Sequence, residues 1–241
     1  MASSHAEARE RRNQILLIDA DDTLWETNLL YERVLDQFVA WLAPFGYERD
    51  SVRQQVDVAE RRNIRLRGYG ARNFLHTLEE VTLQLIGPSP DFLPSLRQQI
   101  EELGRHLLAT QPEIFDGVAD TLAYLDRRHQ LYLFSKGQTE EQGDKIRGSG
   151  LERFFRAWEI VPEKDEAAYR ELAERHRFPA GAVWMVGNSP RSDINPALAA
   201  GLNAVYIPSQ YCWEYENEEL RRPGPGELLV LKRFRELQDH F

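Results

Sequence analysis

Short runs of apolar residues alternate with longer amphipathic stretches over much of the chain. The first run, Ile15-Leu16-Leu17-Ile18, is continuous, which is typical of a strand buried on both faces of a parallel sheet. Later runs predict further strands at residues 131–134, 158–161, 182–186, 204–207 and 228–231. Helical spacing of apolar residues falls between them, over residues 118–126, 140–148, 166–176 and 193–200. This alternation predicts an α/β fold with a Rossmann-like parallel sheet core and helices on both faces.

The long stretch between the first two predicted strands has only helical periodicity. Its apolar positions predict amphipathic helices around residues 30–42, 52–59, 74–85 and 96–107. Proline and glycine residues interrupt this pattern, most clearly in the run Gly87-Pro88-Ser89-Pro90. We therefore expect an inserted all-helical cap domain at residues 27–111 and a core made of residues 14–26 and 112–241. The polar residues 1–13 are expected to form a disordered tail.

Composition and charge exclude several classes of protein. The chain has 241 residues, of which 42% are hydrophobic and 29% charged, as in an ordinary soluble globular protein. A net charge of −9 argues against a partner nucleic acid, although a local pocket could still bind a small anion. No apolar stretch is long enough to span a membrane, and the start does not resemble a secretory signal. Cys212 is the single cysteine, which suits a reducing cytoplasm. We expect a cytoplasmic protein with no membrane partner; the oligomeric state is open.

Polar segments follow four of the predicted strands at the point where each strand ends. They are Asp19-Ala20-Asp21-Asp22-Thr23, Ser135-Lys136-Gly137, Pro162-Glu163-Lys164-Asp165 and Gly187-Asn188-Ser189-Pro190-Arg191-Ser192-Asp193. Because the carboxyl ends of parallel strands share one edge of the sheet, we expect these segments to converge. The three carboxylates of the first segment repel one another, so a divalent cation with oxygen ligands is expected beside them. The alternative is an acidic turn that caps a helix, and Asp22 is expected to be either capping or solvated.

Each of the other three segments also admits two interpretations. The Ser135 hydroxyl and the Gly137 turn could bind a phosphate oxygen, or Ser135 could cap the next helix. Lys164 precedes a helix whose dipole opposes it, so it either points into an acidic site or is a solvated surface lysine. Asp193 follows a helix cap at Ser189, and it either reaches a cation or only complements the helix dipole.

The combined set resembles the motifs of a known family. Asp19-x-Asp21-x-Thr23, Ser135, Lys164 and Gly187-Asn188…Asp193 resemble the four motifs of the haloacid dehalogenase (HAD) superfamily. The resemblance covers residues 15–207, and residues 135–151 resemble its phosphatase-like members. The helical insertion looks like the type 1 cap of that superfamily.

The resemblance implies a role for each matching residue. Asp19 would be the nucleophile that becomes an aspartyl phosphate, Asp21 the general acid and base, and Lys164 the lysine that pairs with nucleophile and phosphate. Thr23 would shape the loop and support Asp21. Substrate phosphate would be bound by Thr23, Ser135, Lys136 and Gly137. Magnesium would be bound by Asp19, Asp21, Asp193 and Asn188, although Asn188 stands where the family most often has an aspartate.

These implied roles predict a magnesium-dependent phosphatase acting on a small phosphorylated metabolite. The resemblance implies that members which cleave carbon–halogen bonds lack the second aspartate, so Asp21 favours phosphoryl transfer. A phosphomutase or another phosphoryl transferase remains an alternative, as does a catalytically weak regulatory or binding homologue, which only Asn188 supports. Arg65, Arg67 and Arg72 surround a glycine-rich connection in the insertion and either bind a second anionic group or form an ordinary charged connection.

Overall fold

The computed structural model describes residues 13–87, 93–108, 111–179, 181–211, 213–221 and 224–241. The tail expected at residues 1–13 therefore lies outside the described residues except for Asn13. The chain divides into two compact units, one formed by Met1–Asn28 with Gln111–Phe241 and the other by Leu29–Thr110. Within the described ranges, no helix combines the length and the apolar character that a bilayer-spanning segment needs.

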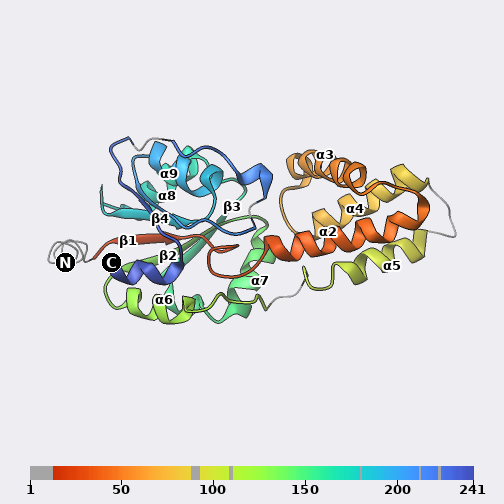
Figure 1. The fold of residues 1–241 in the computed structure, drawn as a ribbon. Helices are drawn as coiled ribbons and strands as arrows, with labels where there is room; N and C mark the ends of the chain where they lie inside the picture. The colour runs from red at the N-terminus through yellow and green to blue at the C-terminus, as the bar shows by residue number, and fades with distance from the viewer. Residues whose placement is uncertain (1–12, 88–92, 109–110, 180, 212, 222–223) are drawn as a thin grey trace. The chain divides into compact units, whose positions relative to one another are not determined.

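The first unit is built on a six-stranded sheet in the order β3-β2-β1-β4-β5-β6. Strands β1 to β4 are labelled in Figure 1. Every neighbouring pair is parallel. The strands are β1 Ile15–Ile18, β2 Gln130–Lys136, β3 Ala157–Val161, β4 Val183–Gly187, β5 Asn203–Tyr206 and β6 Leu228–Val230. Each overlaps one of the predicted strands, so the predicted parallel α/β sheet is confirmed.

Helices cover both faces of this sheet. They are α6 Val118–Asp126, α7 Thr139–Ser149, α8 Glu166–His176 and α9 Asn195–Ala199. Short helical turns are η2 Glu152–Phe154, the π-helical η3 Pro190–Ile194, η4 Glu214–Glu216 and η5 Phe234–Asp239. The helix predicted over residues 193–200 is thus split into η3 and α9, because a wide π turn starts at Pro190 and passes into the α-helix at Asn195.

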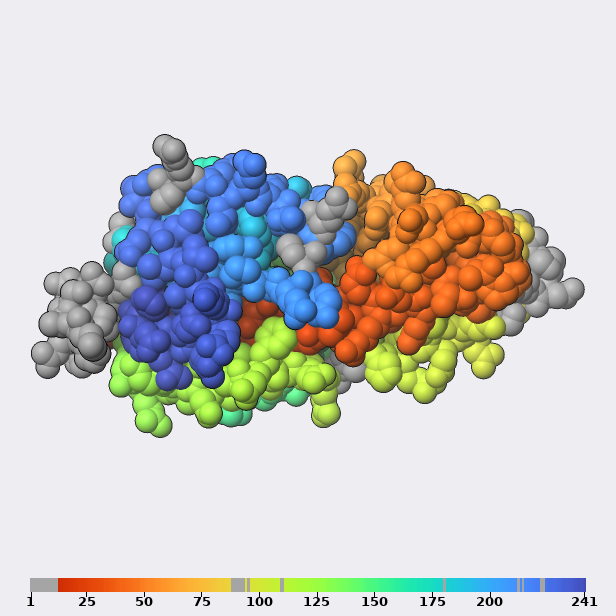
Figure 2. All heavy atoms as spheres, in the orientation of Figure 1, coloured from red at the N-terminus to blue at the C-terminus, as the bar shows by residue number. Residues whose placement is uncertain are grey.

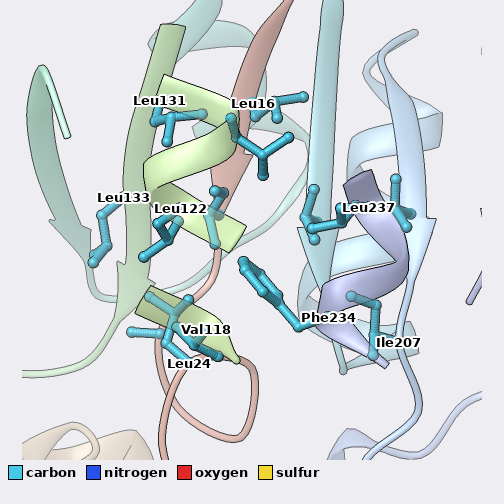
Figure 3. Close-up of a cluster of buried hydrophobic side chains, with 14 of the residues drawn as sticks. Leu16, Leu24, Val118, Leu122, Leu131, Leu133, Ile207, Phe234 and Leu237 are labelled. Carbon is cyan, nitrogen blue, oxygen red and sulfur yellow. The ribbon is translucent and has the colours of Figure 1, made fainter. Parts of the chain in front are cut away.

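The side chains of β1 point alternately into two buried clusters. Leu16 and Ile18 belong to the cluster that α6 and η5 cover, as Figure 3 shows around Leu122 and Leu237. Ile15 and Leu17 belong to the opposite cluster, beneath α8 and α9. Residues of the C-terminal end of the chain, dark blue in Figure 2, lie against the green surface of α6. Burial on both faces explains why the β1 sequence is continuously apolar.

Strand order places the end of β1 where ligands bind in sheets of this type. Ile18, the last residue of β1, lies opposite Leu133 of β2 and Val186 of β4, so both neighbouring strands run alongside the end of β1. After β1 the chain adds β2 and β3 on one side, then returns to add β4, β5 and β6 on the other. The crevice between β1 and β4 is therefore the topological switch point of the sheet, and Asp19 follows directly after β1.

The second unit consists of helices with a hydrophobic core of their own. Its elements are α2 Asn28–Leu42, η1 Ala43–Phe45, α3 Arg49–Arg67, α4 Ala71–Ile86 and α5 Leu93–Leu103. Phe38, Val56, Leu78 and Leu96 are among the side chains buried in this core. Each helix overlaps one that the periodicity predicts, because the spacing of apolar residues marks the face that packs inward.

Candidate active site

Asp19 begins the candidate site at the end of the central strand. Its backbone N–H donates to the carbonyl of Val186 at 2.9 Å, which continues the β1–β4 ladder by one residue. The carboxylate is almost wholly buried, with a relative exposure of 7% for the residue. Oδ1 accepts a hydrogen bond from Lys164 Nζ, and Oδ2 accepts one from the Thr23 hydroxyl at 3.0 Å. Both carboxylate oxygens of Asp19 thus have defined partners.

Lys164 bridges Asp19 and Asp193. It lies between β3 and α8, whose N-cap is the neighbouring Asp165. Its ammonium contacts Asp19 Oδ1 and lies 2.7 Å from Asp193 Oδ1, while its side chain is 1% exposed. Burial alone would lower the pKa of Lys164, but the two carboxylates outweigh it and raise that pKa. The structure therefore supports the interpretation that Lys164 points into an acidic site, and not the one that it is a solvated surface lysine.

The loop after β4 holds Asp193 against the end of the sheet. Ser189 caps η3, as predicted, because its hydroxyl accepts from the backbone N–H of Ser192 at 2.9 Å. The backbone N–H of Ser189 in turn donates to Asp193 Oδ2 at 2.9 Å. A Cβ atom on Gly187 would lie well inside van der Waals contact with the same carboxylate. The glycine is therefore required for the close approach of Asp193 to the end of β4.

The charges of this cluster do not balance. Two buried carboxylates, Asp19 and Asp193, share the single ammonium of Lys164. Burial and repulsion from Asp193 raise the pKa of Asp19 by more than Lys164 lowers it. An additional positive charge beside these carboxylates would remove that repulsion.

The oxygen donors of the cluster fit Mg²⁺. The Thr23 hydroxyl also lies 3.3 Å from Asn188 Oδ1, which places that amide oxygen near Asp19. Among the residues that the structure describes, no three His, Cys, Asp or Glu side chains form a group that could hold a metal ion. Mg²⁺ ordinarily binds through one or two carboxylates and takes its remaining ligands from water and substrate phosphate. Asp19, Asp193 and Asn188 supply oxygen donors of this kind.

Asp21 points away from this cluster toward α7. Its Oδ1 accepts from Trp25 Nε1 at 2.8 Å, from the Thr27 hydroxyl at 2.8 Å and from Lys145 Nζ at 2.6 Å, and its Oδ2 accepts from Gln142 Nε2 at 2.6 Å. Burial works to raise the pKa of Asp21, but Lys145 and the hydrogen bonds lower it to about 2. The structure therefore brings Asp19, Lys164 and Asp193 together and directs the Asp21 carboxylate to other donors.

Asp22 is buried rather than solvated. Its carboxylate accepts the backbone N–H of Thr27 at 3.1 Å and that of Asn28 at 3.0 Å, which caps the start of α2. Burial raises the pKa of Asp22 to about 8, although these two hydrogen bonds oppose the shift. Of the two expectations for Asp22, capping is confirmed and solvation is wrong.

The three residues Ser135, Lys136 and Gly137 at the end of β2 differ in their contacts. Ser135 is 1% exposed, and its hydroxyl makes no hydrogen bond within the described part of the chain. It does not cap the next helix, because the N-cap of α7 is Gln138. Lys136 Nζ contacts the Ser192 hydroxyl at 2.9 Å and Glu216 Oε1 at 2.5 Å. The Gly137 N–H donates to a carbonyl of β3, so this donor is already used within the sheet.

Sequence reasoning missed three side chains of this region. Gln142 and Lys145 lie on one face of α7, a helix with few apolar residues, and Glu216 lies in the irregular segment after β5. No recognisable motif marks them, since a polar side chain in such a segment is usually solvated. The i, i+3 spacing of Gln142 and Lys145 was the available signal, because it places both on the same helix face.

Comparison with known proteins identifies relatives of the chain. The family model for haloacid dehalogenase-like hydrolases matches residues 14–201. Among curated proteins, YfnB of Bacillus subtilis, whose name assigns it to the HAD-hydrolases, is 24% identical over 148 residues. That match covers 58% of this chain and 58% of YfnB, so it spans little more than half the length of that relative.

Solved structures share the fold over nearly the whole chain. A haloacid dehalogenase-like family hydrolase from Xanthomonas campestris is 29% identical, with a TM-score of 0.79, over 94% of this chain and 89% of that one. YfnB, solved bound to magnesium, is 19% identical with a TM-score of 0.62, over 94% of this chain and 97% of that one. L-2-haloacid dehalogenase from Xanthobacter autotrophicus is 15% identical with a TM-score of 0.59, over 94% and 97%. At such low identity the last two show a common fold alone.

Proposed function

The chain belongs to the haloacid dehalogenase-like hydrolase family, and on that premise we propose that it is a magnesium-dependent phosphatase acting on a small phosphorylated metabolite. The observation that carries this proposal is the buried cluster of Asp19, Lys164 and Asp193 at the switch point of the sheet. A carboxylate nucleophile is repelled by a phosphate dianion, so it needs positive charge beside it. Lys164 supplies part of that charge.

Asp19 is the nucleophile in this proposal. One of its carboxylate oxygens attacks phosphorus, and the bond between phosphorus and the leaving-group oxygen breaks, which leaves an aspartyl phosphate. Water then attacks, inorganic phosphate leaves, and the Asp19 carboxylate is restored. The Lys164 contact with Asp19 orients the attacking carboxylate and neutralises charge on the transferred group.

A magnesium ion would be held by Asp19, Asp193 and Asn188, and when bound it would supply positive charge to the transferring phosphoryl group. The magnesium-bound form of YfnB supports the choice of ion. The Asp21 carboxylate, also expected as a ligand, contacts Lys145 and Gln142 of α7 and not the Lys164 ammonium that Asp19 and Asp193 share. The side chains proposed as magnesium ligands are therefore those of Asp19, Asp193 and Asn188.

Asp21 is the proton carrier of the proposed reaction. An alkoxide leaving group needs a proton, and the attacking water must lose one, so one carboxyl can serve both half-reactions. The contacts with Lys145 and Gln142 favour the ionised form, which suits the second half-reaction. In the first half-reaction Asp21 must carry a proton, which requires that the Lys145 contact be exchanged for one with the leaving group.

The Ser135 hydroxyl supports binding of the phosphate group. Ser135 lies near the end of β2, the strand next to β1 in the sheet. In the described ranges, no side chain makes a hydrogen bond with its hydroxyl. A hydroxyl at this position can donate to a phosphate oxygen. Thr23 supports the site differently, because its hydroxyl fixes Asp19 Oδ2.

A turnover assay tests the proposal. The purified chain is given p-nitrophenyl phosphate and a panel of phosphorylated metabolites, with Mg²⁺ and with EDTA. We expect phosphate release that depends on Mg²⁺. Parallel incubation with 2-chloropropionate measures halide release, and a hexose phosphate reports migration of the phosphate between hydroxyls. Halide release without phosphate release would show a dehalogenase, phosphate migration would show a mutase, and no turnover while the chain binds Mg²⁺ would show a binding homologue.

A further inference from the structure

Glu216 is a largely buried carboxylate that the proposed reaction does not use. It ends η4 in the segment that follows β5, and its side chain is 12% exposed. Oε1 lies 2.5 Å from Lys136 Nζ, and Oε2 accepts hydrogen bonds from the hydroxyls of Ser189 at 2.6 Å and Ser192 at 2.5 Å. Three side chains from two other segments of the chain therefore converge on one carboxylate.

Each partner of Glu216 is next to a residue of the candidate site. Lys136 follows Ser135 at the end of β2, and Ser192 immediately precedes Asp193. Ser189 has the most direct connection, because its backbone N–H donates to Asp193 Oδ2 at 2.9 Å. Glu216 thus links the ends of β2 and β4 through contacts that do not involve the sheet itself.

The contacts of Glu216 favour its ionised form. Lys136 is 13% exposed, so removal of the carboxylate charge would take a salt bridge from a largely buried ammonium. Burial works to raise the pKa of Glu216, but Lys136 and the serine hydroxyls outweigh it and hold that pKa below its ordinary value. The carboxylate therefore stays ionised at neutral pH and serves as the acceptor of all three contacts.

Neighbouring residues of the same segment reinforce the attachment. The Tyr215 hydroxyl accepts from Arg191 at 3.0 Å, and the Asn195 side chain donates to the carbonyl of Glu219 at 3.0 Å and accepts from the N–H of Arg221 at 2.9 Å. The segment 215–221 therefore runs along the loop that carries Asp193. Glu216 is its connection to the buried interior of that loop.

We propose that Glu216 is a positioning residue that fixes the Asp193 loop and the Lys136 ammonium in the geometry the candidate site requires. Its effect on turnover rests on the proposed phosphatase function, whereas its effect on Mg²⁺ binding does not. Outer partners that orient metal ligands typically change metal affinity or activity by roughly 10- to 100-fold when they are removed. Glu216 acts on Asp193 in this way, through Ser189 and Ser192.

The test compares Glu216→Gln with Glu218→Gln. Glu218 lies on the same segment and pairs with Arg191 at 3.2 Å, but contacts none of the three partners of Glu216. We measure kcat and KM with p-nitrophenyl phosphate, the Kd for Mg²⁺ by calorimetry, and the melting temperature. We expect kcat of Glu216→Gln to fall roughly tenfold or more and its Kd for Mg²⁺ to rise roughly tenfold. Both are measured at a temperature well below the melting temperature of the variant. Glu218→Gln is expected to stay within about twofold of wild type.

A double variant separates charge from packing. Glu216→Gln combined with Lys136→Met removes both members of the salt bridge, so it should regain part of the Mg²⁺ affinity that the single variant loses. A double variant that regains nothing would contradict the role of the ion pair. If Glu216→Gln does not fold, Glu216→Asp replaces it, because it keeps the charge but shortens the side chain, and the same losses are expected.

Two results would overturn the proposal. One is wild-type kcat and wild-type Mg²⁺ affinity in Glu216→Gln. The other is a loss confined to the melting temperature, which would show that Glu216 only stabilises the fold. If wild type itself releases no phosphate from any substrate, the proposed function fails, yet the Mg²⁺ Kd of the same variants still decides the role of Glu216.

Discussion

The ammonium of Lys164 lies 2.7 Å from Oδ1 of Asp193, although the two residues lie on different loops of the sheet edge. The same ammonium contacts Asp19. All three side chains are nearly inaccessible to solvent, so their charges interact strongly. One ammonium between two carboxylates leaves an excess negative charge, and this relationship underlies the first prediction.

Lys164→Met should destabilise the chain in the absence of metal. Removing one partner of a buried ion pair leaves uncompensated charge and typically costs about 3–5 kcal/mol. Added Mg²⁺ should raise the melting temperature more in this variant than in wild type, because the ion would replace the lost positive charge. Lys232→Met is the control, since Lys232 is exposed. If Lys164→Met and wild type had the same melting temperature in EDTA, the buried ion pairs of Lys164 would not stabilise the fold, and the prediction would be wrong.

Gly187→Ala should displace the Asp193 carboxylate. The added methyl group would overlap Asp193 Oδ2, and overpacking of this kind costs about 1–3 kcal/mol. We expect a lower melting temperature and weaker Mg²⁺ binding by calorimetry. Gly224→Ala is the matched control, because among the described residues beyond its chain neighbours none has an atom within 4 Å of a Cβ atom placed there. Equal Mg²⁺ affinity in the two variants would show that Asp193 does not need this close approach.

Lys145→Met should change how turnover depends on the leaving group. Lys145 helps to lower the pKa of Asp21 to about 2, so its removal should raise that pKa and allow more Asp21 to carry a proton. An alkyl phosphate needs that proton, whereas p-nitrophenolate leaves without it. The ratio of kcat for an alkyl phosphate to kcat for p-nitrophenyl phosphate at pH 6 should therefore increase.

The matched control for this prediction is Arg147→Met. Arg147 lies on the same helix but is 53% exposed and pairs with Asp144. The ratio of kcat for an alkyl phosphate to kcat for p-nitrophenyl phosphate should be the same in Arg147→Met as in wild type. An unchanged ratio in Lys145→Met would mean that the contact with Lys145 does not limit proton transfer by Asp21.

His129 should make the fold sensitive to moderate acid. Burial and the neighbouring Arg128 lower its pKa from 6.5 to about 4, and its Nδ1 accepts the N–H of Gln14 at 3.2 Å. The unfolded chain binds a proton near pH 6.5 while the folded chain does not, so stability should fall as the pH drops from 6.5 to 4. The loss from this residue should be on the order of 2 kcal/mol.

Urea unfolding at pH 7 and pH 4.5 measures this effect. His129→Asn keeps a side-chain acceptor for Gln14 but cannot take up a proton, so its two unfolding free energies should differ less than those of wild type. Equal differences in the two proteins would assign the acid sensitivity to other groups.

Strand patterns made much of the fold predictable. The continuous apolar run of β1 predicts a central strand because both of its faces are buried, and the polar segments at the strand ends predict one shared edge. The same reasoning brought Asp19, Lys164 and Asp193 together, although Lys164 lies 145 positions after Asp19 in the sequence. Sheet topology supplies such long-range proximity whenever the strands are parallel.

Contacts that depend on tertiary packing could not be predicted in this way. Lys145 reaches Asp21 across 124 positions and Glu216 reaches Lys136 across 80, and neither lies at a strand end where topology would place it. The direction of the Asp21 carboxylate depends on these packed neighbours. The motif predicted that Asp21 follows Asp19 on the same turn, but it could not predict which donors Asp21 contacts.

Capture of the covalent intermediate tests the central claim most directly. Wild type is mixed with Mg²⁺ and excess p-nitrophenyl phosphate, quenched in acid within the first turnovers, digested and analysed by mass spectrometry. We predict one added phosphoryl group on Asp19, and none in Asp19→Asn, which should remain folded but release no phosphate. A phosphoryl group on another residue, or wild-type turnover in Asp19→Asn, would contradict the nucleophilic role of Asp19.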